Sequence, residues 1–213
     1  FHELSNISAV VLMGQAGSSG GDALADVLSG KVSPCGHLAA TWAKEYEDYP
    51  NADTFGYRNG NRDDEYYTEG IYVGYRWFDS FGKVPAYPLG YGKSYTDFEI
   101  KAGKISVEGN EIQIPVTVKN TGNVDTSDVV EIYASNPDSS YGDTAPQKKL
   151  VGFEKVALKA GESANVDIHV DASALEVWDV NAGEYVVEDG TYQLYAAHSS
   201  DLKGENVLSK KVK

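Results

Sequence analysis

The sequence contains one cysteine and no long apolar run. With Cys35 alone an intrachain disulfide is excluded, which fits a cytosolic protein without excluding a secreted one. No apolar stretch approaches the roughly 20 residues that a membrane-spanning helix needs. The chain opens on Phe1 rather than Met and shows no signal peptide, so we expect the native start to lie upstream. Cytoplasmic and secreted locations both stay open.

Basic residues are also scarce. The sequence has 18 Lys and Arg against 32 Asp and Glu, which gives a formal net charge of −14. Because such a chain repels phosphate backbones and anionic lipid, the composition argues against nucleic acid and membrane surfaces as partners.

Residues that ligate metals are scattered. The four histidines lie far apart and the single cysteine has no second thiol to pair with, so no zinc site and no cofactor is predicted. Glu111, Asp128 and Glu131 would bind calcium only if the fold brought them together. We interpret them as the solvated faces of strands.

The first 95 residues predict an α/β arrangement. Residues 7–13 (ISAVVLM) form a short apolar run typical of a buried strand, a Gly- and Ser-rich loop follows, and residues 22–28 (DALADVL) have helical periodicity. Strand, loop and helix in this order indicate a parallel sheet. One such unit cannot cover both faces of a sheet, so the chain is expected to begin partway through a domain.

From about Phe98 the pattern changes to short alternating runs. Turn residues separate them, as at 120–123 (NTGN), 160–162 (AGE) and 188–190 (EDG). The pattern is typical of an antiparallel β-sandwich of about seven strands and about a hundred residues. The clearest predicted strands are residues 111–119, 129–133, 166–170, 185–187 and 192–196. The fold class is therefore α/β followed by all-β, with a partial α/β domain over residues 1–95 and a β-sandwich over residues 96–213.

Two stretches carry candidate chemistry. Residues 17–21 (GSSGG) match the G-x-S-x-G turn of serine hydrolases, with Ser19 as nucleophile, although a structural glycine turn explains them more simply. Residues 63–95 are dense in aromatic and charged side chains and include Glu65, Glu69 and Asp79, with Arg76 as a cation beside them. Paired carboxylates are what glycoside hydrolysis needs. An ion pair between Glu69 and Arg76 that ties loops together is the structural alternative.

Several motifs resemble glycoside hydrolase family 3, in order and across nearly the whole chain. Residues 67–79 (YTEGIYVGYRWFD) resemble its Y-x-E-G-hydrophobic-x-V-G-Y-R-aromatic-aromatic-D signature, and residues 88–98 (PLGYGKSYTDF) resemble P-F-G-Y-G-L-S-Y-T-x-F. Residues 26–42 resemble D-V-L-x-G-x-x-x-P-x-G-[RK]-L-x-x-T-[WF], with His37 in place of the Arg or Lys. Residues 148–163 (KKLVGFEKVALKAGES) resemble part of the family's fibronectin type III-like domain.

The resemblance implies a retaining, exo-acting β-glycosidase, most simply a β-glucosidase. In this family a barrel carries the nucleophilic Asp and an α/β sandwich domain supplies the acid/base Glu from a loop upstream of this chain. The resemblance therefore implies that the chain contains neither catalytic residue and that Glu69 and Arg76 support the cleft. Its partners would be a β-linked oligosaccharide or glycoside and the missing barrel and α/β segment, in the same or another chain. A non-catalytic carbohydrate-binding or interaction module is the alternative.

Overall fold

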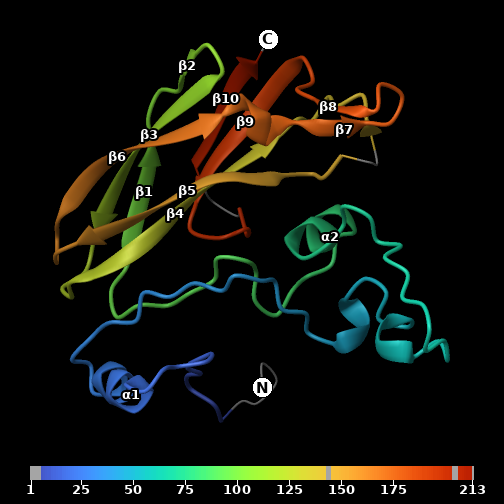
Figure 1. Cartoon of the computed structure of the whole chain (residues 1–213). Helices are drawn as coiled ribbons and strands as arrows, with labels where there is room; N and C mark the ends of the chain where they lie inside the picture. The colour runs from blue at the N-terminus through green and yellow to red at the C-terminus, as the bar shows by residue number, and fades with distance from the viewer. Residues whose placement is uncertain (1–5, 143–144, 203–205, 213) are drawn as a thin grey trace.

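The computed structural model describes residues 6–142, 145–202 and 206–212. Two parts lie one above the other (Figure 1). The upper part is a β-sandwich, and the lower part is an extended chain with short helices, residues 6–97, here called the N-terminal segment. This arrangement confirms the predicted fold class.

Two antiparallel four-stranded sheets form the sandwich. In the first, β3 (Glu111–Asn120) pairs with β1 (Phe98–Ala102) and β2 (Ser106–Glu108) and also with β6 (Ser163–Asp171). The order of the second is β10 (Asn206–Val212), β9 (Gly190–Ala197), β4 (Thr126–Ser135) and β5 (Lys149–Leu158). A hairpin of β7 (Val177–Asp179) and β8 (Glu184–Val186) follows the short 3-10 helix η4 (Ala172–Leu175).

Strand β3 shows why the sandwich forms. Its alternating pattern places Ile112, Ile114, Val116 and Val118 on one face, and each is at most 1% exposed. They pack in one cluster with Val130, Ile132 and other apolar residues of the second sheet. Strand periodicity of two thus places one apolar face of each sheet against the other.

The turn after β3 fastens the start of β1. The fully buried amide of Asn120 donates to the carbonyl oxygen of Val124 at 2.8 Å and accepts from the Thr96 hydroxyl at 2.7 Å and the Gly122 N–H at 3.1 Å. A side chain at residue 122 would meet Thr96, since an added Cβ lies 2.2 Å from its Oγ1. Glycine is required there by this close approach.

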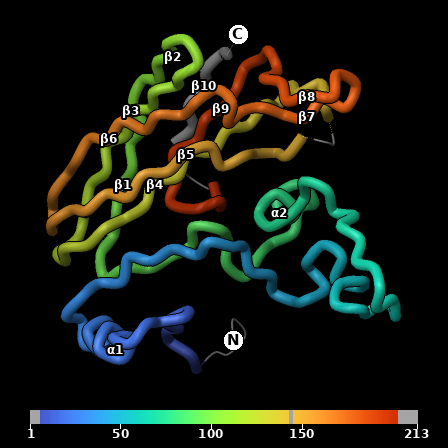
Figure 2. Tube along the Cα trace, viewed as in Figure 1, coloured from blue at the N-terminus to red at the C-terminus, as the bar shows by residue number. Residues whose placement is uncertain are grey.

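The N-terminal segment runs beneath the second sheet (Figure 2). It contains α1 (Gly20–Leu28), η1 (Tyr46–Asp48), η2 (Phe55–Tyr57) and α2 (Tyr75–Ser80). Two stretches far apart in sequence lie side by side, because the N–H of Leu38 donates to Tyr91 and the N–H of Trp42 donates to Tyr87, both at the carbonyl oxygen. Among the described residues, no helix has the length and apolar character to cross a bilayer.

One local prediction is wrong. Helix α1 forms where residues 22–28 predicted it, but residues 7–13 form no strand, and Val10 and Leu12 are 53% and 60% exposed. A strand needs neighbouring strands to satisfy its backbone, and every pairing among the named strands of the described residues is antiparallel and lies in the sandwich or its hairpin. The apolar run is exposed as a result.

Candidate functional site

The loop that leads into α2 holds Glu69, the first predicted site residue. Its carboxylate is half-buried and accepts a hydrogen bond from the side-chain amide of Asn51. The hydroxyl of Thr68 donates to Oδ1 of the same Asn51 at 2.8 Å. Asn51 adopts a left-handed conformation with φ +57°, which asparagine tolerates better than most residues. Glu69 is thus held by an amide.

Arg76, the second predicted site residue, lies on α2. Its guanidinium carbon is 5.8 Å from the ring centroid of Tyr75, and its Nε is buried without a hydrogen-bond partner in the described part of the chain. No ion pair joins Arg76 to Glu69 among the described residues. The structural tie considered from the sequence is therefore not formed, and the support of a cleft by these residues stays a prediction.

Helix α2 is instead fastened to the sandwich by its two ends. The Tyr75 hydroxyl accepts a hydrogen bond from the backbone N–H of Leu150 at 2.8 Å, and Asp79 forms an ion pair of 2.6 Å with Nζ of Lys148. Burial raises the pKa of the Asp79 carboxyl, although Lys148 acts against it. The signature sequence of residues 67–79 therefore ends in a docking contact.

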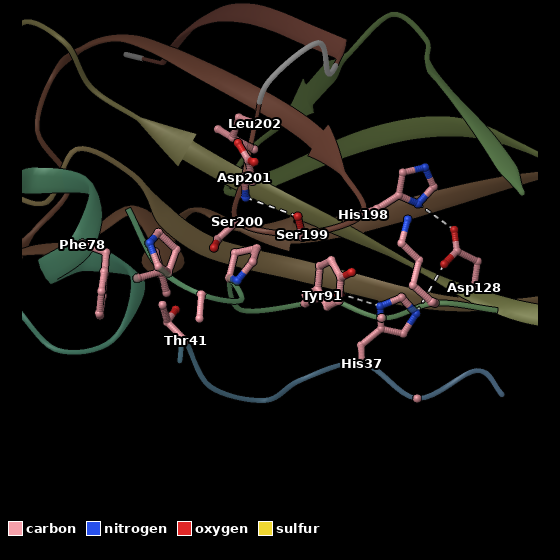
Figure 3. Close-up of a pocket in the computed structure, with 18 of the residues that line it drawn as sticks. His37, Thr41, Phe78, Tyr91, Asp128, His198, Ser199, Ser200, Asp201 and Leu202 are labelled. Carbon is pink, nitrogen blue, oxygen red and sulfur yellow. Dashed lines mark hydrogen bonds and ion pairs between the residues drawn. The ribbon is translucent and has the colours of Figure 1, made fainter. Parts of the chain in front are cut away.

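A second contact between the two parts is a cluster of His37, Asp128 and His198 (Figure 3). Oδ1 of Asp128 lies 3.3 Å from Nε2 of His37, and its Oδ2 lies 2.7 Å from Nδ1 of His198. The side chain of Asp128 is only 8% exposed. Burial by itself would raise the pKa of this carboxyl, but the contacts with His198 and His37 outweigh it and hold the pKa at about 2.

Glu131 and Tyr133 form a second buried polar contact further along β4. The buried Tyr133 hydroxyl donates to Oε2 of Glu131 at 2.7 Å. Burial raises the pKa of both groups. Gly90 lies against this carboxylate, since an added Cβ would come within 2.5 Å of Oε2. The interpretation of Asp128 and Glu131 as solvated strand faces is wrong, because the N-terminal segment covers them and each residue is 6% exposed.

These contacts border a pocket of about 750 Å³ between the segment and the sandwich. Its lining brings together residues from both parts, including His37, Asp79, Asp128, Lys148 and His198. With its pKa held at about 2, Asp128 is poorly suited to act as a general acid, and Asp79 is paired with Lys148. These charges join the two parts of the molecule.

Other sequence candidates find no support as reactive groups. Ser19 is exposed just before α1, while the rings of His37, His169 and His198 contact Gly90, Asp128 and Glu111. His2 lies outside the described residues. No group of three or more potential metal-ligating side chains occurs in the described ranges.

The ion pairs that join the two parts were not predicted from the sequence. Lys148, Asp128 and His198 are polar residues in or beside strands, where solvent exposure is the ordinary expectation. The one available signal was that apolar residues flank Glu131 on both sides in the sequence. In the structure residues 130–134 are all buried. A strand buried on both faces lacks the clean alternation of a half-exposed one.

The comparisons with known proteins cover both parts. Residues 1–75 match the Glycosyl hydrolase family 3 C-terminal domain, and residues 128–200 match the Fibronectin type III-like domain. The chain is 38% identical over 209 residues to Beta-glucosidase BoGH3A of Bacteroides ovatus, which covers 94% of this chain and 27% of that protein. The chain belongs to glycoside hydrolase family 3. A second relative is the Exo-alpha-(1->6)-L-arabinopyranosidase of Bifidobacterium breve, which is 39% identical over 193 residues; the match covers 90% of this chain and 25% of that protein.

Solved structures agree with this family 3 assignment. The beta-glucosidase of Kluyveromyces marxianus in complex with glucose superposes with a TM-score of 0.84 at 36% identity, covering 91% of this chain and 23% of that one. Beta-glucosidase 3B of Thermotoga neapolitana in complex with glucose gives 0.82 at 35% identity, with 92% and 27% covered. The chain thus spans about a quarter of the length of the relatives it matches.

Proposed function

We propose that this chain is part of a retaining, exo-acting β-glucosidase that hydrolyses terminal β-D-glucosyl residues of oligosaccharides or glycosides. The observation that carries the proposal is the superposition of 91% of the chain on a beta-glucosidase in complex with glucose. The test compares how fast the complete polypeptide hydrolyses p-nitrophenyl β-D-glucoside and p-nitrophenyl α-L-arabinopyranoside. Preference for the arabinopyranoside, which the name of the Bifidobacterium breve relative suggests as the competitor, would contradict the glucosidase assignment.

The chain alone is proposed to lack the catalytic pair. Retaining hydrolysis needs two carboxylates about 5–5.5 Å apart on either side of the scissile bond. The most buried carboxylates described, Asp128 and Glu131, are engaged by histidines and by Tyr133. The homogeneous 213-residue chain should not hydrolyse aryl β-glucosides. Turnover that a substitution within the chain abolishes would contradict this.

Exposed apolar surface supports a missing partner. The run at residues 10–13 is 44–60% exposed, and a second set of exposed rings belongs to residues around η2 and before Glu69, namely Phe55, Tyr57, Tyr66 and Tyr67. Surfaces of this kind mark protein interfaces. We assign them to the barrel and the rest of the α/β sandwich domain, in the same or another chain. The partial domain is proposed to cover residues 1–95 and the fibronectin type III-like domain residues 96–213. Analytical ultracentrifugation of the isolated chain should show self-association, and a stable monomer would contradict the assignment.

Glu69 and Arg76 are proposed to shape the cleft from this side. The support is the place of Glu69 shortly after the exposed Tyr66 and Tyr67 in sequence, and the Nε of Arg76, which has no acceptor in the described part of the chain. A guanidinium left without an acceptor is suited to a group that the rest of the enzyme or the substrate supplies.

A carbohydrate-binding module is the second candidate function. One observation favours it: Trp178 and Tyr185 lie opposite each other on the β7–β8 hairpin, 49% and 65% exposed, with ring centroids 5.0 Å apart. Exposed aromatic faces suit stacking on sugar rings. Binding of β-linked oligosaccharides by the chain, lost in Trp178→Ala and kept in Phe153→Ala, would favour the module over a purely structural role.

A further inference from the structure

His37 makes contacts that a neutral imidazole cannot satisfy. Its Nδ1 lies 2.6 Å from the carbonyl oxygen of Gly90, and its Nε2 lies 3.3 Å from Oδ1 of Asp128. Both oxygens only accept hydrogen bonds, whereas a neutral ring carries a single N–H. The imidazolium carries two and can donate to both. The arrangement therefore fits a protonated His37.

The two acceptors belong to different parts of the molecule. Gly90 lies in the N-terminal segment and its N–H donates to the carbonyl oxygen of Leu38, so His37 closes a local loop within the segment. Asp128 lies on β4 of the sandwich. Close by, the N–H of Ser200, which follows β9, donates to the carbonyl oxygen of Leu89 at 2.9 Å. The ring thus stands at the seam where the segment meets the second sheet (Figure 3).

We propose that His37 is a proton-operated latch: protonated, it ties the loop at Gly90 to Asp128 and so holds the N-terminal segment on the β-sandwich, and on deprotonation it releases one of the two ties. Loss of the ring proton also leaves the buried Asp128 with His198 as its remaining basic contact in the cluster. A buried carboxylate that keeps one basic contact in place of two is less well compensated, so the seam loosens.

The surrounding charges favour the protonated ring. Asp128 raises the pKa of His37 most, burial opposes this, and the Gly90 carbonyl and Glu131 add to the rise. The other groups at the seam are Tyr133 beside Glu131 and His198 beside Asp128, with Lys155 of β5 at 3.4 Å from Sγ of Cys35. Tyr91 and Lys93 of the N-terminal segment also line the pocket, and both follow Gly90 closely in sequence.

The pH window follows from the direction of each shift. His37 starts from a pKa of 6.5 that folding raises, so its stabilisation is complete below 6.5 and disappears as pH rises through the raised value. Asp128 starts from 3.8 and falls to about 2, so its contribution is present above 3.8 and is lost as pH falls towards 2. The latch is closed between these limits and opens on the alkaline side.

The family motif suggests a variant that separates the charge of His37 from its titration. At the position of His37 that motif has Arg or Lys, which keep their charge across this range. His37→Lys should therefore hold the seam at all pH values near neutrality, whereas His37→Gln should not hold it at any. His169→Gln is the matched control, because His169 pairs with Glu111 on an exposed surface of the sandwich away from the seam.

Hydrogen exchange of the complete polypeptide tests the latch. The reporters are the amides of Leu38, Gly90 and Ser200, corrected for intrinsic exchange, with Ile114 in the core as reference. Between about pH 5.5 and about pH 8.5 we expect wild-type protection at the reporters to fall by about ten- to a hundredfold, the range for a charge-assisted hydrogen bond. The core reference should not change.

The variants distinguish the latch from general pH sensitivity. His37→Gln should match the wild type at the alkaline pH and be less protected at the acidic pH, His37→Lys should stay protected at both, and His169→Gln should follow the wild type. Reporter protection in the wild type that does not change with pH overturns the proposal without any variant. A fall of the same size in His37→Lys also overturns it. If His37→Gln does not fold, the wild type and His37→Lys decide the question.

Discussion

Replacing Lys148 with Met removes the cation that holds Asp79 of α2 to the sandwich. The two groups are 2.6 Å apart, with side chains 10% and 25% exposed, so the pair lies between a surface ion pair and a fully buried one. Exposed pairs contribute about 0–1 kcal/mol, and breaking a buried pair costs about 3–5 kcal/mol. We expect the free energy of unfolding at neutral pH to fall by about 2–3 kcal/mol in Lys148→Met.

The deficit should depend on pH because it arises from a charge. Burial raises the pKa of Asp79 and Lys148 opposes the rise, so the substitution raises this pKa further. Above the new pKa the variant carries an uncompensated carboxylate. As pH falls through it, Asp79 takes up a proton and the deficit shrinks. Asp79→Asn in the Lys148→Met background should recover part of the loss, because a neutral amide needs no cation.

Thermal unfolding followed by circular dichroism measures the effect. A loss of 2–3 kcal/mol lowers the Tm of a chain of this size by roughly 4–12 °C. The control is Lys101→Met, since Lys101 pairs with Glu99 at 3.1 Å with side chains 69% and 48% exposed, and a change within about 0.5 kcal/mol is expected. A Lys148→Met deficit no larger than that of the control, or one that stays constant from neutral to acidic pH, would refute the reasoning.

Three further substitutions test other contacts. Asn120→Ala removes a buried amide with three hydrogen bonds and should lower the free energy of unfolding in urea by about 2–4 kcal/mol. Substitution of the exposed Asn123 by Ala should change it little, and equal effects would contradict the role of the Asn120 amide. Gly90→Ala should cost more than about 2 kcal/mol, because it combines φ +79° with a clash on Glu131, and an unchanged Tm would show that the seam is not tightly packed. In the complete enzyme, Glu69→Gln should lower turnover of all aryl β-glucosides alike and resist azide; a glucosyl azide product would identify Glu69 as the acid/base.

Local sequence was sufficient for the elements whose stability depends on their own pattern. The alternation of residues 111–119 predicted β3 because one face of a half-buried strand is always apolar. Helical spacing predicted α1, and the motifs of residues 26–42, 67–79 and 88–98 were enough for the family. Each of these signals lies within a short stretch of sequence and does not depend on contacts with the rest of the enzyme.

Only the tertiary structure decided where the polar residues lie. Asp128 and Glu131 are charged strand residues for which solvent exposure is the ordinary expectation, and they are buried where the N-terminal segment meets β4. Residues 7–13 have the sequence of a buried strand, and they are exposed because no neighbouring strand in the described residues pairs with them. Glu69 is held by Asn51, not by Arg76. In each case the outcome depends on which part of the molecule, distant in sequence, packs against these residues. Burial and charge pairing are properties of that packing, and the periodicity along one strand does not encode them.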